Sequence, residues 1–148
     1  MHQPGYADDF AAISMVKARY CRFLDTKDWP AYTALFTEDF ILDTSTAGGA
    51  PPVQGREAAI AYIRSCVEAA KTAHHVHNPE IEVEGDTAHV IWAMQDRVIW
   101  PADRAARLGE SGHTGFGQYH ETYRRENGRW RIARSRLLYL IYEPHRLP

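Results

Sequence analysis

The sequence predicts a single α+β domain in which three helices and a curved antiparallel sheet enclose a pocket. Apolar residues recur at helical spacing through the first half of the chain, whereas from His74 onward they alternate as they do in strands. Tight-turn signals at residues 84–86 and 126–128 separate the long alternating segments, a pattern typical of hairpins. The 148 residues contain no repeat or linker and have a common single-domain length, so we expect residues 1–148 to form one unit.

The three helices follow from periodicity and from residues that start helices. The first begins after the aspartates at residues 8–9 and is expected to end near residues 25–27. For the second, Asp28 is a suitable N-cap and Pro30 falls in the first turn. The third is expected over residues 56–71, where isoleucines and a valine share one face.

The strands lie mainly in the second half of the chain. We expect a short strand at residues 40–42 and a strand segment between His74 and the first turn. Long strands are expected over residues 87–100, 116–125 and 130–142. Residues 101–115, which include His113, are expected to form a polar loop.

Composition excludes several classes of protein. The net charge is −2 with balanced signs, so there is no electrostatic footprint for nucleic acid. No apolar run approaches the roughly 20 residues that span a membrane, and residues 1–5 lack the layout of a secretory signal. The two cysteines, Cys21 and Cys66, fall inside expected helices and indicate no disulfide framework. We therefore expect a cytoplasmic protein without membrane or nucleic-acid partners.

A carboxylate interrupts an apolar stripe on the strand at residues 87–100. Alternate residues share a face, which places Asp96 in line with Trp92, Met94 and Trp100. Burying a carboxylate costs several kcal/mol unless it is paired. Asp96 is therefore either one half of a structural ion pair, with Arg136 of the last strand as a candidate partner, or an acid that lines a wet pocket.

Two residues of the first helix also carry chemistry. Tyr20 falls on the apolar stripe, where it is either core filler or a hydroxyl held for a purpose. Asp25 lies near the helix C-terminus, where the helix dipole disfavours an acid. A histidine partner would explain Asp25.

Three histidines gather in the segment His74-His75-Val76-His77-Asn78, and three interpretations compete. His75 and His77 share a face and could bind a metal with His89 or His120, although no familiar zinc spacing is present. The segment could instead be a solvated strand start. Alternatively, one histidine could act as a general base, the usual role of this side chain near neutral pH.

The layout resembles the nuclear transport factor 2-like superfamily, and within it the SnoaL-like group, which includes scytalone dehydratase, bile-acid 7α-dehydratase and lindane dehydrochlorinase. The segments that carry the resemblance are Tyr20 with Asp25, residues 74–78 running into residues 85–88, and residues 130–136. The resemblance covers nearly the whole chain. It implies a cone-shaped barrel whose sheet and helices enclose an apolar pocket.

The resemblance also implies site residues. Dehydratase and dehydrohalogenase members use an Asp–His dyad, often beside a tyrosine, and Asp25, His74 and Tyr20 match those positions. Asp96 and Arg136 fall where bile-acid dehydratase-like members carry further pocket residues.

The histidine of the dyad could be His75 instead of His74. Ile81 and Val83 share the parity of His75, so an inward-facing His74 requires a bulge or twist near Pro79.

The resulting hypothesis is a cofactor-free, metal-free lyase of the dehydratase type, or an isomerase, acting on a small, apolar, cyclic or polycyclic ligand. Tyr20, Asp25 and His74 would be catalytic, and Trp92, Met94, Asp96, Trp100 and Arg136 would bind substrate. The alternatives are a non-catalytic binding module of the same fold and an epoxide hydrolase, for which a second acid is not obvious. The apolar parity of Leu137, Tyr139 and Ile141 further predicts a homo-oligomer, a dimer or trimer.

Overall fold

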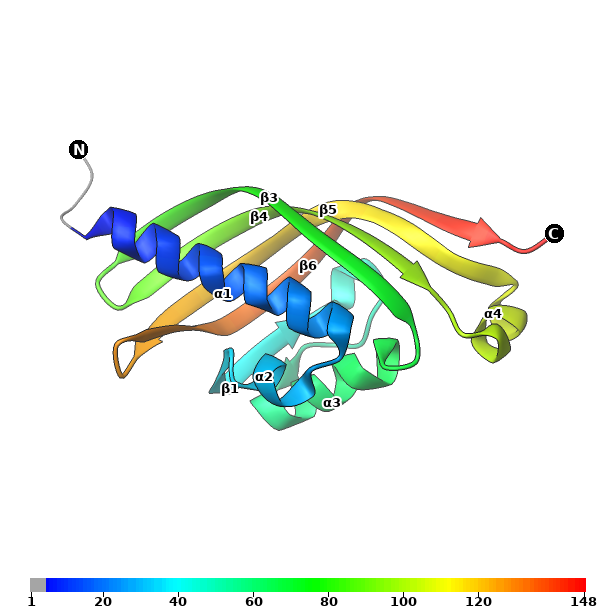
Figure 1. Ribbon diagram of the computed structural model, residues 1–148, viewed down its shortest axis with the longest axis horizontal. Coiled ribbons are helices and arrows are strands. Elements are labelled where there is room, and N and C mark those ends of the chain that lie inside the picture. Colours follow the sequence, from blue (N-terminus) through cyan, green and yellow to red (C-terminus); the bar gives the residue numbers. More distant parts are fainter. Residues whose placement is uncertain (1–4) are drawn as a thin grey trace.

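A computed structural model describes residues 5–148 and shows a six-stranded sheet arched over three helices (Figure 1). The elements in chain order are α1 (Tyr6–Thr26), α2 (Trp29–Thr33), β1 (Phe36–Asp43), the 3-10 turn η1 (Ser45–Ala47), β2 (Val53–Gln54), α3 (Arg56–Val67), β3 (Lys71–Glu84), β4 (Thr87–Ile99), α4 (Ala102–Leu108), β5 (Glu110–Glu126) and β6 (Arg129–Arg146). The α+β class is confirmed.

The sheet differs from the expected one in two respects. Its order is β2-β1-β6-β5-β4-β3, and β1 runs parallel to β6, so the sheet is mixed and not purely antiparallel. It is also open and curved, not a closed barrel. The physical reason is that α1 packs against β3 while α3 packs against β1, so helices occupy the space between the two edges of the sheet.

The core lies between α1 and the inner face of the sheet. The buried face of α1 includes Ile13, Val16 and Leu24, spaced as a helical stripe. On β4 the alternate residues from Ala88 to Val98 are buried, which matches the apolar parity of the sequence.

Two bulges in β6 decide which of its side chains point inward. The register with β5 gains one residue between Ile132 and Arg134 and another between Tyr139 and Ile141. A single extra residue moves the following side chains to the other face. The inward face therefore changes from Trp130 and Ile132 to the opposite parity after the first bulge, and it changes back after the second, where Tyr142 faces inward. The expectation that Leu137, Tyr139 and Ile141 share one face is therefore wrong, because the second bulge separates Ile141 from the other two.

The expected loop at residues 101–115 is wrong as well. It contains α4, which begins after Pro101 and ends at Gly109 in the left-handed conformation, and β5 then starts at Glu110. Both ends carried ordinary helix signals. Arg104 of α4 donates to the backbone oxygen of Cys66 at 2.7 Å, which ties α4 to the end of α3. The third helix is shorter than expected, because β3 begins already at Lys71.

A buried ion pair joins α1 to the sheet. Lys17 Nζ lies 2.7 Å from Glu121 Oε1, and both side chains are fully buried. Glu121 also accepts hydrogen bonds from Ser135 Oγ at 2.9 Å and from Tyr123 Oη at 2.7 Å. The carboxylate therefore has partners that offset its desolvation.

Among residues 5–148, no helix has both the length and the apolar character that crossing a membrane requires. Residues 1–4, on which most of the argument against a secretory signal was based, lie outside the described residues.

Candidate active site

A cavity of about 330 Å³ opens between the helices and the inner face of the sheet. It is lined by Tyr20, Leu24, Leu42, Thr44, Ala47, Gly48, Gly49, Tyr62, Ile63, Cys66, Val67, His74, Asp96, Val98, Trp100, Arg104, His113, Tyr119, Ser135, Leu137, Tyr139 and Tyr142. A larger hollow of about 750 Å³ lies between α1 and the β5–β6 turn, but it contains neither His74 nor Asp96. We place the candidate site in the smaller cavity, because its apolar walls hold a few converging polar groups.

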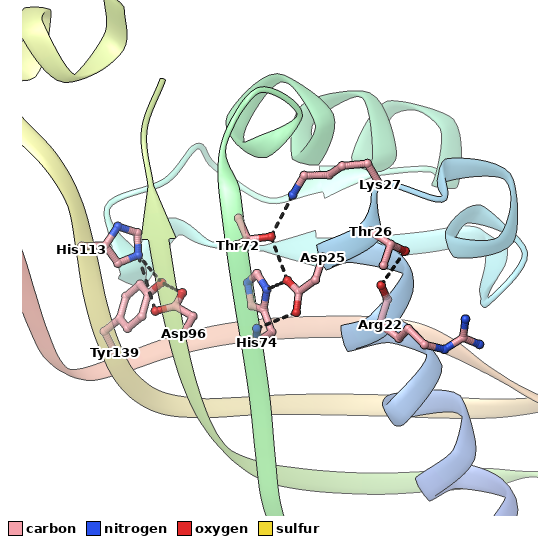
Figure 2. A network of polar contacts seen from close by, with 9 residues as sticks. All are labelled: Arg22, Asp25, Thr26, Lys27, Thr72, His74, Asp96, His113 and Tyr139. Atoms are coloured by element: carbon pink, nitrogen blue, oxygen red, sulfur yellow. Dashed lines mark hydrogen bonds and ion pairs between the residues drawn. The ribbon is translucent and has the colours of Figure 1, made fainter. Parts of the chain in front are cut away.

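One of these groups is an Asp–His dyad (Figure 2). His74 Nδ1 lies 2.7 Å from Asp25 Oδ1, and the backbone N–H of His74 donates to Asp25 Oδ2 at 2.8 Å. Thr72 Oγ1 donates to Asp25 Oδ1 at 2.8 Å, and Lys27 Nζ donates to Thr72 Oγ1 at 2.8 Å. The carboxylate at the end of α1 is thus held by two residues at the start of β3.

This geometry fixes the tautomer of His74. A carboxylate only accepts hydrogen bonds, so Nδ1 carries the hydrogen and Nε2 has a free lone pair. Burial alone would raise the pKa of the Asp25 carboxyl, but its contacts with His74 and Thr72 outweigh burial and lower that pKa. Asp25 is therefore a carboxylate at neutral pH and can stabilise a proton taken up by His74.

The lowered pKa of Asp25 predicts a pH-dependent contribution to stability. A carboxyl whose pKa is lower in the folded state stabilises the fold above its unfolded pKa of about 3.9, and this contribution is lost as pH falls through the folded pKa. We expect Asp25→Asn to reduce the free energy of unfolding at pH 7. The difference in free energy of unfolding between wild type and this variant should become smaller as the pH falls below about 5. Urea titrations across pH measure this difference, and a difference that stays constant to pH 3 would contradict the assignment.

A bulge in β3 allows His74 to face inward together with Ile81. The register with β4 shifts between His77 and Glu80, so the bulge required near Pro79 is confirmed. His74 pairs with Asp96 across the two strands, and its side chain is only 8% exposed. His75, the alternative, is exposed.

Tyr20 lies in the wall of the same cavity as His74. Its ring contacts those of Tyr32 and Tyr119, with centroids 5.1 and 5.8 Å away. Burial, followed by the negative charge of Glu121, raises the pKa of the Tyr20 hydroxyl. Tyr20 is therefore a hydrogen-bond donor at neutral pH.

The partner of Asp96 is not Arg136. Tyr139 Oη donates to Asp96 Oδ2 at 2.5 Å, and His113 Nε2 lies 3.5 Å from Asp96 Oδ1. The first bulge of β6 turns Arg136 outward, where its side chain is 44% exposed and 3.9 Å from Asp43. Arg136 therefore does not line the cavity, although the sequence predicted that it would. The predicted pairing of Arg136 with Asp96 is also wrong.

The expected apolar walls are only partly right. Trp100 lines the cavity, and the Arg104 guanidinium lies over its ring, with Arg104 Cζ 3.8 Å from the ring centroid of Trp100. Trp92 and Met94 are not among the lining residues; they lie further along β4 in the core, where Trp92 Nε1 donates to Tyr123 Oη at 3.3 Å. They share the face of Asp96, but this stretch of the sheet is covered by core packing.

Comparison with known protein families identifies the family of this chain. The sequence profile of the SnoaL-like domain matches residues 5–136. This chain belongs to the SnoaL-like domain family. The SnoaL-like domain is 23% identical over 142 residues to the relative named Probable cyclase FGR4 of Gibberella zeae, covering 90% of this chain and 92% of that protein.

Solved structures similar to this SnoaL-like domain share its fold. The Kfla4162 protein of Kribbella flavida matches with a TM-score of 0.82 and 22% identity, covering 93% of this chain and 94% of that one. A protein of Novosphingobium aromaticivorans provisionally named a scytalone dehydratase gives a TM-score of 0.79 and 22% identity, over 96% and 91% of the chains. A hexachlorocyclohexane dehydrochlorinase, type 2, gives a TM-score of 0.78 and 17% identity, covering 96% of this chain and 95% of that one.

Among the polar residues of the cavity in this SnoaL-like domain, sequence reasoning missed the two that contact Asp96, His113 and Tyr139. His113 was assigned to a loop, although it is one of the buried residues of β5. Tyr139 was assigned to the outer face, because the bulges of β6 leave no mark in its apolar alternation. Recognising α4 from Pro101 and Gly109 would have placed His113 in a strand.

The metal interpretation gains no support from the geometry of the described residues. His75 and His77 point away from the cavity and are exposed. Within residues 5–148 no group of three or more histidine, cysteine, aspartate or glutamate side chains is close enough together to hold a metal ion.

Proposed function

We propose that this SnoaL-like domain is a lyase of the dehydratase type, or an isomerase, that uses its own side chains to remove a proton from a carbon atom. The observation that carries the proposal is the 2.7 Å contact between Asp25 Oδ1 and His74 Nδ1, because His74 lies in the wall of a cavity that also has large apolar side chains. It leaves His74 Nε2 as a base, and no hydrogen bond occupies that nitrogen among the described residues.

The proposed reaction begins with transfer of a proton from carbon to His74 Nε2. The carbon must lie next to an activating carbonyl, so that the remaining electron pair is delocalised onto oxygen. Asp25 stabilises the imidazolium that forms, and the Tyr20 hydroxyl donates to the oxygen that gains negative charge. Return of the proton to another carbon gives isomerisation, whereas loss of a neighbouring hydroxyl gives dehydration.

The cavity supports a small, largely apolar cyclic substrate. Its volume of about 330 Å³ is at the lower end of the usual range for small-molecule sites. Leu24, Leu42, Val98 and Leu137 provide apolar walls, and Trp100 provides an aromatic one. The names of the relatives, a cyclase, a scytalone dehydratase and a dehydrochlorinase, support chemistry of the lyase or isomerase type.

Two bicyclic ketones test the proposal. 3-Hydroxy-1-tetralone carries a hydroxyl beta to its carbonyl, and its dehydration product rearranges to fluorescent 1-naphthol. 1-Tetralone lacks the hydroxyl and reports only removal of the C2 proton, as deuterium uptake from D₂O. We expect the wild-type protein to accelerate at least one of these reactions. A variant in which His74 is replaced should accelerate neither.

The alternative is a non-catalytic binding module, favoured by the same observation of a formed apolar cavity. In that case the ketones would bind, seen as perturbed aromatic resonances of the cavity tyrosines, without deuterium uptake or dehydration. This outcome would contradict the proposed enzyme and identify the domain as a carrier or sensor.

We also propose that the domain forms a homo-oligomer, although Leu137 and Tyr139, which suggested one, line the cavity instead. Support comes from the exposed apolar end of β6, where Leu140 is 72% and Ile141 53% exposed. Size-exclusion chromatography with light scattering measures the mass, and a monomer at micromolar concentration would contradict this proposal.

A further inference from the structure

A second polar cluster shares the cavity with the dyad (Figure 2). It consists of Asp96 on β4, His113 on β5 and Tyr139 on β6. Tyr139 Oη donates to Asp96 Oδ2 at 2.5 Å, while His113 Nε2 lies 3.5 Å from both Asp96 Oδ1 and Tyr139 Oη. Asp96 is 3% exposed and His113 6% exposed, so the cluster is shielded from water.

Two buried polar atoms of the cluster have no hydrogen bond from the protein. Among the described residues, neither Asp96 Oδ1 nor His113 Nδ1 has a hydrogen bond. An unsatisfied buried polar atom costs roughly 1–3 kcal/mol. Both residues line the cavity, so a polar group of a bound ligand can supply the missing partners.

A glycine on the neighbouring strand makes room for this cluster. Gly115 pairs with Asp96, and its backbone is not in the left-handed region that favours glycine. A Cβ at this position would collide with Asp96 Oδ1 and with the Tyr139 ring. The glycine is therefore required by the side chains of the cluster, which indicates a built site and not an accident of packing.

The cluster lies beside the proposed base. His74 and Asp96 are directly paired on adjacent strands, where opposite Cβ atoms are about 5 Å apart. In each of the two Asp–His pairs, one ring nitrogen of the histidine faces the aspartate. His74 Nδ1 faces Asp25, and His113 Nε2 faces Asp96. The second nitrogen of each histidine has no hydrogen-bond partner among the described residues.

We propose that His113 is the general acid of this site, that Asp96 and Tyr139 position it, and that the substrate carries its departing hydroxyl at this end of the cavity. This inference rests on the proposed function. His74 Nε2 takes the proton from carbon, the C–H electron pair forms the carbon–carbon double bond, and the C–O bond breaks. For this step His113 is an imidazolium, with its Nε2–H facing the Asp96 carboxylate. The departing oxygen takes the Nδ1 proton of this imidazolium and leaves as water, which leaves His113 neutral. Exchange with solvent then removes the proton from His74 and returns one to His113.

The division of roles within the cluster follows from acidity. Burial, together with the neighbouring Asp96 charge, raises the pKa of the Tyr139 hydroxyl far above neutral, so Tyr139 donates a hydrogen bond and keeps its proton. Burial alone would raise the pKa of Asp96, but its contacts with His113 and Tyr139 lower it, so Asp96 is a carboxylate. His113, whose Nε2 faces this carboxylate, is therefore the member of the cluster that transfers a proton.

The inference defines the substrate class more narrowly than the proposed function does. The substrate is a cyclic ketone with an acidic C–H and a hydroxyl on the adjacent carbon. The hydroxyl meets both free atoms of the cluster, because it can donate to Asp96 Oδ1 and accept from His113 Nδ1.

Three probe compounds distinguish the contribution of the general acid from that of the general base. Dehydration of 3-hydroxy-1-tetralone needs both, deuterium uptake at C2 of 1-tetralone needs only the base, and 3-acetoxy-1-tetralone loses acetate, which leaves without a proton. The test variant is His113→Gln. Its matched control is His120→Gln, which changes the same residue type on the other face of β5.

We expect His113→Gln to lower dehydration of 3-hydroxy-1-tetralone by roughly 10²–10⁴-fold. Deuterium uptake by 1-tetralone and loss of acetate should stay within a few-fold of wild type, and His120→Gln should match wild type on all three probes. Retained deuterium uptake also shows that the variant is folded. If His113→Gln is not soluble, Asp96→Asn serves instead and should give the same selective loss.

Other outcomes overturn the inference. Unchanged dehydration by His113→Gln would show that the proton comes from elsewhere. An equal loss on all three probes would show a structural role. A wild-type protein that acts on none of the probes would refute the proposed function and this inference with it, whereas either of the first two outcomes leaves the proposed base intact.

Discussion

Replacing His74 by glutamine is expected to lower kcat/KM for 3-hydroxy-1-tetralone by roughly 10²–10⁴-fold, the usual contribution of a general base. Glutamine can keep a hydrogen bond to Asp25 but cannot accept a proton from carbon. His74 lies in the cavity wall and not in the main core, so we expect the fold to remain intact. Fluorescence of 1-naphthol measures the rate, and circular dichroism checks the fold.

The matched control is His75→Gln. His75 is the next residue of β3, but it is exposed and faces away from the cavity. This variant should match wild type within a few-fold. A folded His74→Gln variant with full activity would show that another group removes the proton.

The largest expected loss of stability comes from Lys17→Met. The Lys17 ammonium lies 2.7 Å from Glu121 and over the rings of Tyr20 and Tyr119, 3.8 and 3.6 Å from their centroids. Methionine has a similar volume but leaves the Glu121 carboxylate buried without its counterion, which costs about 3–5 kcal/mol. We expect the free energy of unfolding, measured by urea denaturation, to fall by this amount.

Two further variants show that the loss is due to the unpaired charge. Lys17→Met combined with Glu121→Gln should recover part of the stability, because no buried charge remains. Arg64→Met removes an ion pair with Glu68 whose side chains are 45% and 50% exposed, and should change stability by about 1 kcal/mol or less. A Lys17→Met protein within 1 kcal/mol of wild type would contradict the assigned role.

Most of the fold followed from local patterns, and the part that did not was determined by contacts distant in sequence. The helical stripe of α1 and the alternation of β4 are local, so their buried faces were predictable. The bulges of β6 are set by pairing with β5, and β6 has too little polar alternation to reveal them. This is why Arg136 was placed inside and Tyr139 outside.

The dyad was easier to predict than the second cluster. Asp25 was an unfavourable acid at a helix end and His74 belonged to a dense histidine segment, and resemblance to a family joined the two. His113 had neither signal, because the expected loop hid its strand. Its contact with Asp96 exists only once β4 and β5 are paired in register.

The most direct test of the central claim, that Asp25 and His74 remove a proton from carbon, is deuterium uptake at C2 of 1-tetralone in D₂O, followed by NMR. Wild-type protein should exchange this position well above the buffer rate, His74→Gln should exchange it at the buffer rate, and Asp25→Asn should lie between the two. A wild-type protein that binds 1-tetralone in the cavity and exchanges it no faster than buffer would contradict the account.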